Sequence, residues 1–100
     1  MEKHTAHCKL SKVKALIEAD KVRATRVAYD GAALVGISTL DAMCEVVTRL
    51  TPADFYKSMT THNDHRVWQD VYHGKTTDGI ALYVKLTVVD DLLIVSFKEL

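Results

Sequence analysis

The sequence predicts an α+β fold in which helices pack on an antiparallel β-sheet. Apolar residues recur at helical spacing in the first half of the chain. Residues 67–98 instead carry the alternation and the aromatic and β-branched side chains of strands. The chain has 100 residues, of which 48% are hydrophobic, so it can form a core, and we expect residues 1–100 to be one domain.

The first half predicts three helices and the start of a fourth. Ser11 is a suitable N-cap for a helix to about Asp20, and a weaker helix is expected over residues 24–35, with Gly36 as its C-cap. Residues 38–41 fit a capping box, and the apolar stripe after them predicts a third helix to Leu50, with Cys44 on its inner side. Proline after Thr51 repeats the start signal, which predicts a short helix through residues 55–58.

The last third predicts three strands. They cover residues 67–72, 80–89 and 92–98, with a loop at 73–79 and a turn at Asp90-Asp91 that can be longer than two residues. The N-terminal segment 3–8 is a candidate edge strand. Alternation along the last two strands sets Val84 against Phe97, Leu86 against Val95 and Val88 against Leu93 on the core face.

The same register places Tyr83 opposite Lys98 and Lys85 opposite Ser96 on the other face. A phenol beside two lysines is a candidate site, because lysines can neutralise a phosphate during its transfer. We expect the neighbouring cations to lower the pKa of Tyr83, and burial to lower that of a lysine. An ordinary solvated sheet face is the alternative interpretation of this pattern.

The charge balance argues against a strongly cationic nucleic-acid binder, because 13 basic residues meet 13 acidic ones. Residues 1–26 nevertheless carry seven cations and three anions, a net charge of +4. This end is either a solvated mixed-charge surface or a region that binds a polyanion.

Compartment and metal binding are also constrained by the sequence. It shows no membrane-length apolar run and no secretory signal, so we expect a cytoplasmic protein. Cys8 and Cys44 lack metal-ligand spacing and are expected to be free thiols, and a turn explains His62 and His65.

Three segments also resemble a known family. Residues 54–61 (Asp-Phe-Tyr-Lys-Ser-Met-Thr-Thr), residues 64–72 with Trp-Gln-Asp-Val-Tyr at their end, and residues 93–99 (Leu-Ile-Val-Ser-Phe-Lys-Glu) are similar to the MqsR toxins, the motility quorum-sensing regulators. The resemblance extends over the whole chain. It implies a fold like that of the RelE-type microbial ribonucleases and the toxin role of a type II toxin–antitoxin pair.

The activity implied by this resemblance is ribosome-independent cleavage of single-stranded mRNA at GC-containing triplets such as GCU. The implied partner is an MqsA-like antitoxin, which carries its own zinc and binds operator DNA, so the toxin would meet that DNA only indirectly. No metal, cofactor or membrane is implied for this chain. Attack of a ribose 2′-hydroxyl on the adjacent phosphate would leave a 2′,3′-cyclic phosphate and a 5′-hydroxyl.

The matching motifs assign the family's catalytic residues to this sequence. The catalytic set falls on Lys57, Gln69, Tyr83 and Lys98. Lys85, His73 and Met59 are the candidate RNA-binding residues; His73 and Gly74 stand where the family has Arg-Pro.

Two alternatives from other classes remain. One is a non-enzymatic regulator that binds nucleic acid through the basic N-terminal region, and the other is an interaction module that uses a sheet edge.

Overall fold

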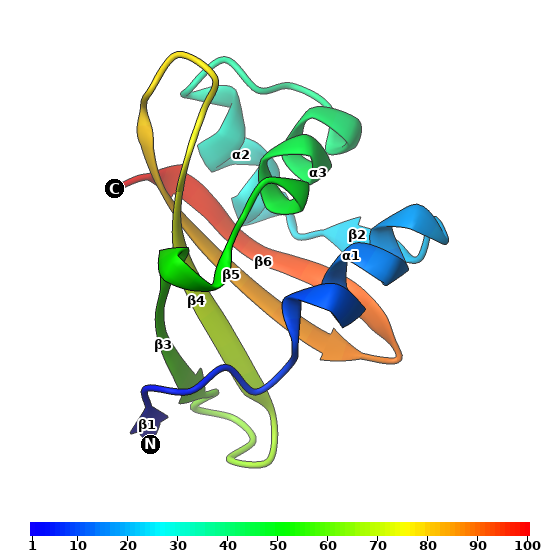
Figure 1. Cartoon of the computed structure of the whole chain (residues 1–100), viewed down its shortest axis with the longest axis vertical. Coiled ribbons are helices and arrows are strands. Elements are labelled where there is room, and N and C mark those ends of the chain that lie inside the picture. Colours follow the sequence, from blue (N-terminus) through cyan, green and yellow to red (C-terminus); the bar gives the residue numbers. More distant parts are fainter.

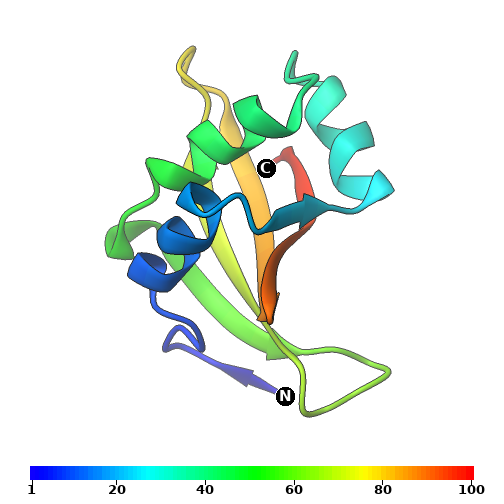
Figure 2. The same ribbon diagram turned by 90° about the vertical axis from the view of Figure 1, so that its right-hand side faces the viewer.

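A six-stranded β-sheet runs through the molecule, and three helices cover one of its faces (Figures 1 and 2). The computed structural model describes all of residues 1–100. In chain order the elements are β1 (Glu2–Lys3), α1 (Leu10–Glu18), β2 (Val22–Ala24), α2 (Arg26–Ala33), α3 (Leu40–Thr48), a 3-10 helix (Pro52–Asp54), β3 (Phe55–Thr60), β4 (Trp68–Lys75), β5 (Ala81–Val89) and β6 (Asp91–Glu99). The α+β class is therefore confirmed. None of the helices is both long and apolar enough to cross a membrane.

The sheet is mixed rather than purely antiparallel. Its strand order is β1-β3-β4-β5-β6-β2, and β2 pairs in parallel with β6 at one edge. Strand β2 was not predicted, because three residues between two helices are too few to show a strand period. The second helix consequently starts later than predicted, at Arg26, where the Thr25 hydroxyl accepts a hydrogen bond from the Ala28 amide at 3.1 Å.

The first helix begins one residue earlier than its predicted cap. Leu10 is its first residue and Lys9 its N-cap, so the prediction of Ser11 as the cap is wrong. The third helix is confirmed, although it ends at Thr48 rather than at Leu50. The Thr39 hydroxyl caps it by accepting from the Ala42 amide at 3.1 Å, and Cys44 is buried on its inner side.

The predicted fourth helix is wrong. Thr51 and Asp54 do form a capping box, but the helix stops after one 3-10 turn and Phe55 begins strand β3. The side chains of this segment explain the change, because β3 buries Ser58 and Thr60 on one face and leaves Lys57 more accessible on the other. Its aromatic and β-branched residues suit a strand, and their preference prevails over the helix-start signal of the proline.

The β5–β6 hairpin confirms part of the predicted register. Val84 pairs with Phe97, as expected. A bulge between Lys85 and Leu86 then shifts the register by one residue, so that Leu86 faces Ile94 rather than Val95. Toward the turn, Val88 likewise meets Leu92 rather than Leu93, and Leu92 and Ile94 fill the core instead of Leu93 and Val95. Asp90 alone forms the tip, with φ of 66°, so the turn is shorter than predicted.

One core of 16 buried residues lies between the sheet and the helices. Helix α2 approaches β6 closely at Gly31, where an added Cβ would lie 2.2 Å from the Phe97 carbonyl oxygen. This contact fixes the end of β6 that carries Lys98.

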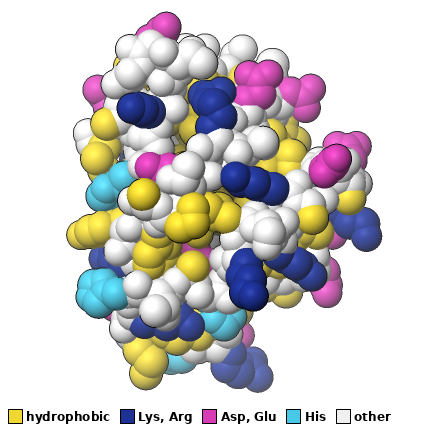
Figure 3. Space-filling view, in the orientation of Figure 1, with side chains coloured by type: hydrophobic (Ala, Val, Ile, Leu, Met, Phe, Trp, Pro, Cys, Tyr) yellow, Lys and Arg dark blue, Asp and Glu magenta, His cyan; other side chains and the backbone are white.

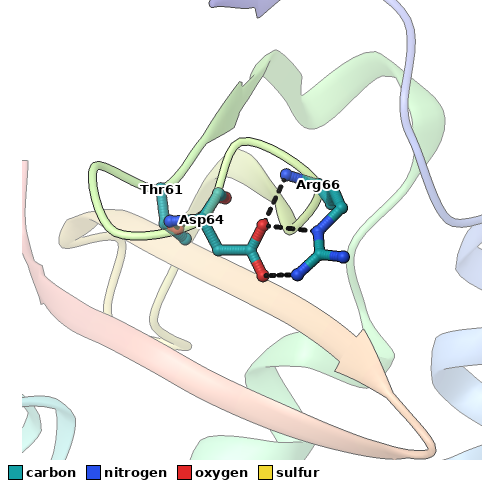
Figure 4. Close-up of polar contacts among 3 residues, drawn as sticks. All are labelled: Thr61, Asp64 and Arg66. Atoms are coloured by element: carbon teal, nitrogen blue, oxygen red, sulfur yellow. Dashed lines mark hydrogen bonds and ion pairs between the residues drawn. The ribbon is translucent and has the colours of Figure 1, made fainter.

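The two loops next to β4 differ from each other. Strand β4 runs to Lys75, so the predicted loop at 73–79 begins later than expected. The β3–β4 loop contains the expected turn: Arg66 clamps the Asp64 carboxylate through Nε at 3.1 Å and a second guanidinium nitrogen at 3.3 Å, and Thr61 Oγ1 accepts from the Asp64 amide (Figure 4). At the N-terminus, residues 3–8 were a candidate edge strand. Of these residues only Lys3 is in a strand, which it forms together with Glu2.

Candidate functional site

The sheet face opposite the helices carries all seven residues that the sequence analysis singled out. Directly paired residues of neighbouring strands point to the same face. Buried Leu82, Val84 and Leu86 define the helix-covered face of β5, so their alternates lie on the open face. Pairing then extends the open face across the other strands. Its side chains form three rows, His73–Tyr83–Lys98, Lys57–Val71–Lys85–Ser96 and Glu2–Met59–Gln69.

The first row contains the predicted phenol–lysine pair. Tyr83 lies directly opposite Lys98 on one side and His73 on the other. Lys98 Nζ is 5.2 Å and Lys85 Nζ 5.9 Å from the centre of the Tyr83 ring. The register prediction is therefore confirmed at this position, and two ammonium groups are near one phenol.

The second row adds a third lysine. Lys57 and Lys85 pair with Val71 from its two sides. Val71 is fully buried although it lies on the open face, which means that neighbouring side chains cover it. It forms an apolar floor between the two lysines.

An aromatic pair borders this floor. The Tyr56 ring, half exposed, stacks on His73 with a centroid separation of 4.4 Å and an angle of 25° between the planes. Lys57 Nζ lies 5.5 Å from the centre of the Tyr56 ring. Strand β3 therefore contributes both a cation and an exposed ring.

Gln69 and Met59 pair directly in the third row. Both are partly exposed. Gln69 lies one row from Lys57, at the spacing of two strand residues, which is about 7 Å.

The charges on the open face influence one another. Burial raises the pKa of Tyr83 even though the Lys57 charge opposes this shift, so the expectation that neighbouring cations would lower it is wrong. The pKa of Lys85 is lowered, first by partial burial and then by the Lys98 and Lys57 charges, in the direction expected for burial of a lysine. The raised pKa keeps Tyr83 a phenol at neutral pH, so it can donate a proton. The lowered pKa makes Lys85 lose its proton more readily than a free lysine.

Lys57 behaves differently because it has an acidic partner. Its Nζ donates a hydrogen bond of 2.6 Å to Glu2 Oε1, and this bond is the main cause that raises the pKa of Lys57. Glu2 carries no signal in the sequence, since its partner is 55 positions away and no motif surrounds it.

The other cationic region lies elsewhere. Several Lys and Arg side chains gather over α1, on the helix side of the molecule (Figure 3). Acidic side chains lie beside them in the same view. The molecule therefore has two separate candidate surfaces for a polyanion, the open sheet face and α1.

The class of protein is defined by its similarity to a known family. A sequence model of the family described as "Motility quorum-sensing regulator, toxin of MqsA" matches residues 5–99. The chain belongs to this family, and the resemblance seen in its sequence is confirmed.

A particular relative supports the same assignment. The mRNA interferase toxin MqsR of Escherichia coli (strain K12) is 52% identical to this chain over 99 residues, and the alignment covers 99% of both proteins.

Proposed function

We propose that this protein is an mRNA endoribonuclease and the toxin of a type II toxin–antitoxin pair. Residues 1–100 would act as one toxin domain in the cytoplasm and would be held inactive by an MqsA-like antitoxin. Family membership and the name of the E. coli relative support this proposal. The observation that carries it is the convergence of Lys57, Tyr83 and Lys98 on one open sheet face.

The three lysines suit a phosphodiester. Lys98 lies on β6 beside Tyr83, Lys85 lies on the same strand as Tyr83, and Lys57 lies on β3, two strands away. A phosphate above the phenol therefore meets the positive charges of Lys57 and Lys98 from different sides. Such charges stabilise the extra negative charge that develops as the phosphate becomes five-coordinate. Gln69 would hold the phosphate or a base by hydrogen bonds, with Met59 packing beside it and His73 contacting RNA.

The chemistry is attack of the ribose 2′-oxygen on the adjacent phosphorus, with departure of the 5′-oxygen. Lys85, whose pKa is lowered, would accept the 2′-hydroxyl proton as a neutral amine. The Tyr83 phenol, whose pKa is raised, would donate its proton to the departing 5′-oxygen. The products are a 2′,3′-cyclic phosphate and a 5′-hydroxyl, and no metal takes part in these steps.

Sequence choice is proposed to favour GC-containing triplets such as GCU. The exposed Tyr56 ring beside Lys57 offers a surface on which a base can stack.

The test is cleavage of a defined RNA that contains a single GCU, with mapping of both new ends. We expect one cut at the triplet, a cyclic phosphate and a 5′-hydroxyl, and undiminished cutting in excess EDTA. Salt-sensitive binding without new ends would instead support the regulator that uses the basic surface over α1. Loss of cutting in EDTA and its rescue by one metal would refute the metal-independent mechanism.

A further inference from the structure

The N-terminal residues 1–8, here called the N-terminal arm, are fastened to the sheet by a buried carboxylate. Asp70 on β4 is only 4% exposed. Its two oxygens accept hydrogen bonds from the His7 amide at 3.0 Å and the Cys8 amide at 2.9 Å. The Ser58 hydroxyl donates a third bond at 2.6 Å, from the neighbouring strand. Charged acceptors make stronger hydrogen bonds than neutral ones, so this is a firm anchor.

Two further contacts hold the arm. The Trp68 ring stacks with His7 at a centroid separation of 5.7 Å, and Lys3 Nζ lies 4.1 Å from its centre. The Thr60 amide donates to the Met1 carbonyl at 3.0 Å, which extends the β1–β3 pairing. The arm is therefore fixed at both of its ends.

This docking places an acidic residue on the open face. Glu2 pairs directly with Met59, so both side chains point to the side that carries Lys57. Lys57 is two residues from Met59 on the same strand, and this diagonal distance is within reach of two long side chains. Their contact is the 2.6 Å bond between Lys57 Nζ and Glu2 Oε1.

The pair is asymmetric in its exposure. The Glu2 side chain is 53% exposed, whereas that of Lys57 is 22% exposed. A free lysine samples many rotamers, and ordering it within the RNA complex would oppose catalysis. With Glu2 bound to it, Lys57 is ordered before the substrate arrives, and two of its three ammonium hydrogens stay available.

We propose that Glu2 is a positioning residue of the RNA-cleaving site, which holds the Lys57 ammonium in place for the scissile phosphate. This inference rests on the proposed function. It extends the site to β1, a strand that carries none of the seven residues assigned to the site above. It also gives the N-terminal arm a role in activity in addition to its role in packing.

The test compares wild-type protein with Glu2→Gln, which keeps the size of the side chain and removes its charge. Glu18→Gln, an exposed glutamate on α1, is the matched control. We expect kcat on the GCU-containing RNA to fall about tenfold in Glu2→Gln, with KM within about twofold, because a misplaced group slows chemistry more than binding. Glu2→Asp should recover part of the loss. The alkaline limb of the pH–rate profile should move to lower pH in Glu2→Gln, since Lys57 loses the partner that keeps it protonated.

Unchanged or increased kcat in Glu2→Gln would overturn the proposal, and an increase would identify Glu2 as an anion that competes with RNA. A second readout needs no activity. NMR titration of the Lys57 εCH2 signals should show a lower pKa in Glu2→Gln than in wild type, and an unchanged pKa would overturn the proposal. Failure of the proposed function would appear differently, as a wild-type protein that does not cut RNA.

Discussion

Replacing Asp70 by alanine should remove the anchor of the N-terminal arm and destabilise the whole protein. The change takes away the acceptor for the His7 amide, the Cys8 amide and the Ser58 hydroxyl. A hydrogen bond to a charged group contributes about 1.5–3 kcal/mol. The sum over three bonds is an upper bound, because the two amides belong to the partly exposed arm and can turn to water.

The Ser58 hydroxyl cannot reach water as easily. Ser58 is fully buried in β3, and its other contact, with the Gln69 carbonyl, is long at 3.5 Å. We therefore expect Asp70→Ala to lower the free energy of unfolding by about 3 kcal/mol, which counts one lost bond in full and the other two in part. For a domain of this size the melting temperature should fall by about 12–24 °C.

The assay is equilibrium unfolding in urea, followed by the fluorescence of Trp68, the single tryptophan. Asp78→Ala, in the exposed β4–β5 loop, is the control and should stay within about 0.5 kcal/mol of wild type. Asp70→Asn keeps one acceptor oxygen and should lose less than Asp70→Ala. A loss below about 1 kcal/mol in Asp70→Ala, with an unchanged cooperative transition, would refute the anchoring role.

Three further outcomes are expected. Tyr83→Phe should fold normally and bind RNA within a few-fold of wild type. It should cleave RNA about 10²–10⁴ times more slowly in a single-turnover assay, because it lacks the proton donor. A cleavage rate within about threefold of wild type would remove Tyr83 from the mechanism. Gly31→Ala should lower the melting temperature in calorimetry by at least about 8 °C, since its Cβ would lie 2.2 Å from the Phe97 carbonyl oxygen. An unchanged melting temperature would contradict this prediction and would mean that α2 can move away from β6. Lys85→Met should stabilise the fold at pH 7 and less so near pH 10.5. The pKa of Lys85 is lower in the folded state, so its positive charge opposes folding at neutral pH. This unfavourable effect fades as pH rises through the folded-state pKa. Urea unfolding at both pH values gives the comparison, and a less stable Lys85→Met protein at pH 7 would contradict the prediction.

The central part of the site could be predicted because it depends on short-range alternation. Strands β5 and β6 are joined by a tight turn, and their apolar residues leave one register that buries Val84 against Phe97. That register alone brings Tyr83 and Lys98 together. The bulge, which leaves Val95 of β6 without a partner on β5, was not predictable, since no glycine or turn residue marks it.

The edges of the sheet were missed for a related reason. Strands β1 and β2 have two and three residues, and each is formed by pairing with a strand far away in the sequence. Strand β3 was interpreted as a helix because Pro52 gives a strong local start signal, while the pairing with β4 that decides its conformation is not local. Glu2 could not be identified as part of the site without the β1–β3 pairing.

The most direct test of the central claim is to locate bound RNA on the protein. A GCU-containing oligonucleotide with a 2′-O-methyl group at the cleavage position cannot react, so it can be titrated while NMR spectra are recorded. If the open sheet face holds the phosphodiester, the largest shifts fall on Lys57, Gln69, Tyr83 and Lys98. Shifts centred on α1 and the segment before it, with these four residues unaffected, would contradict the account.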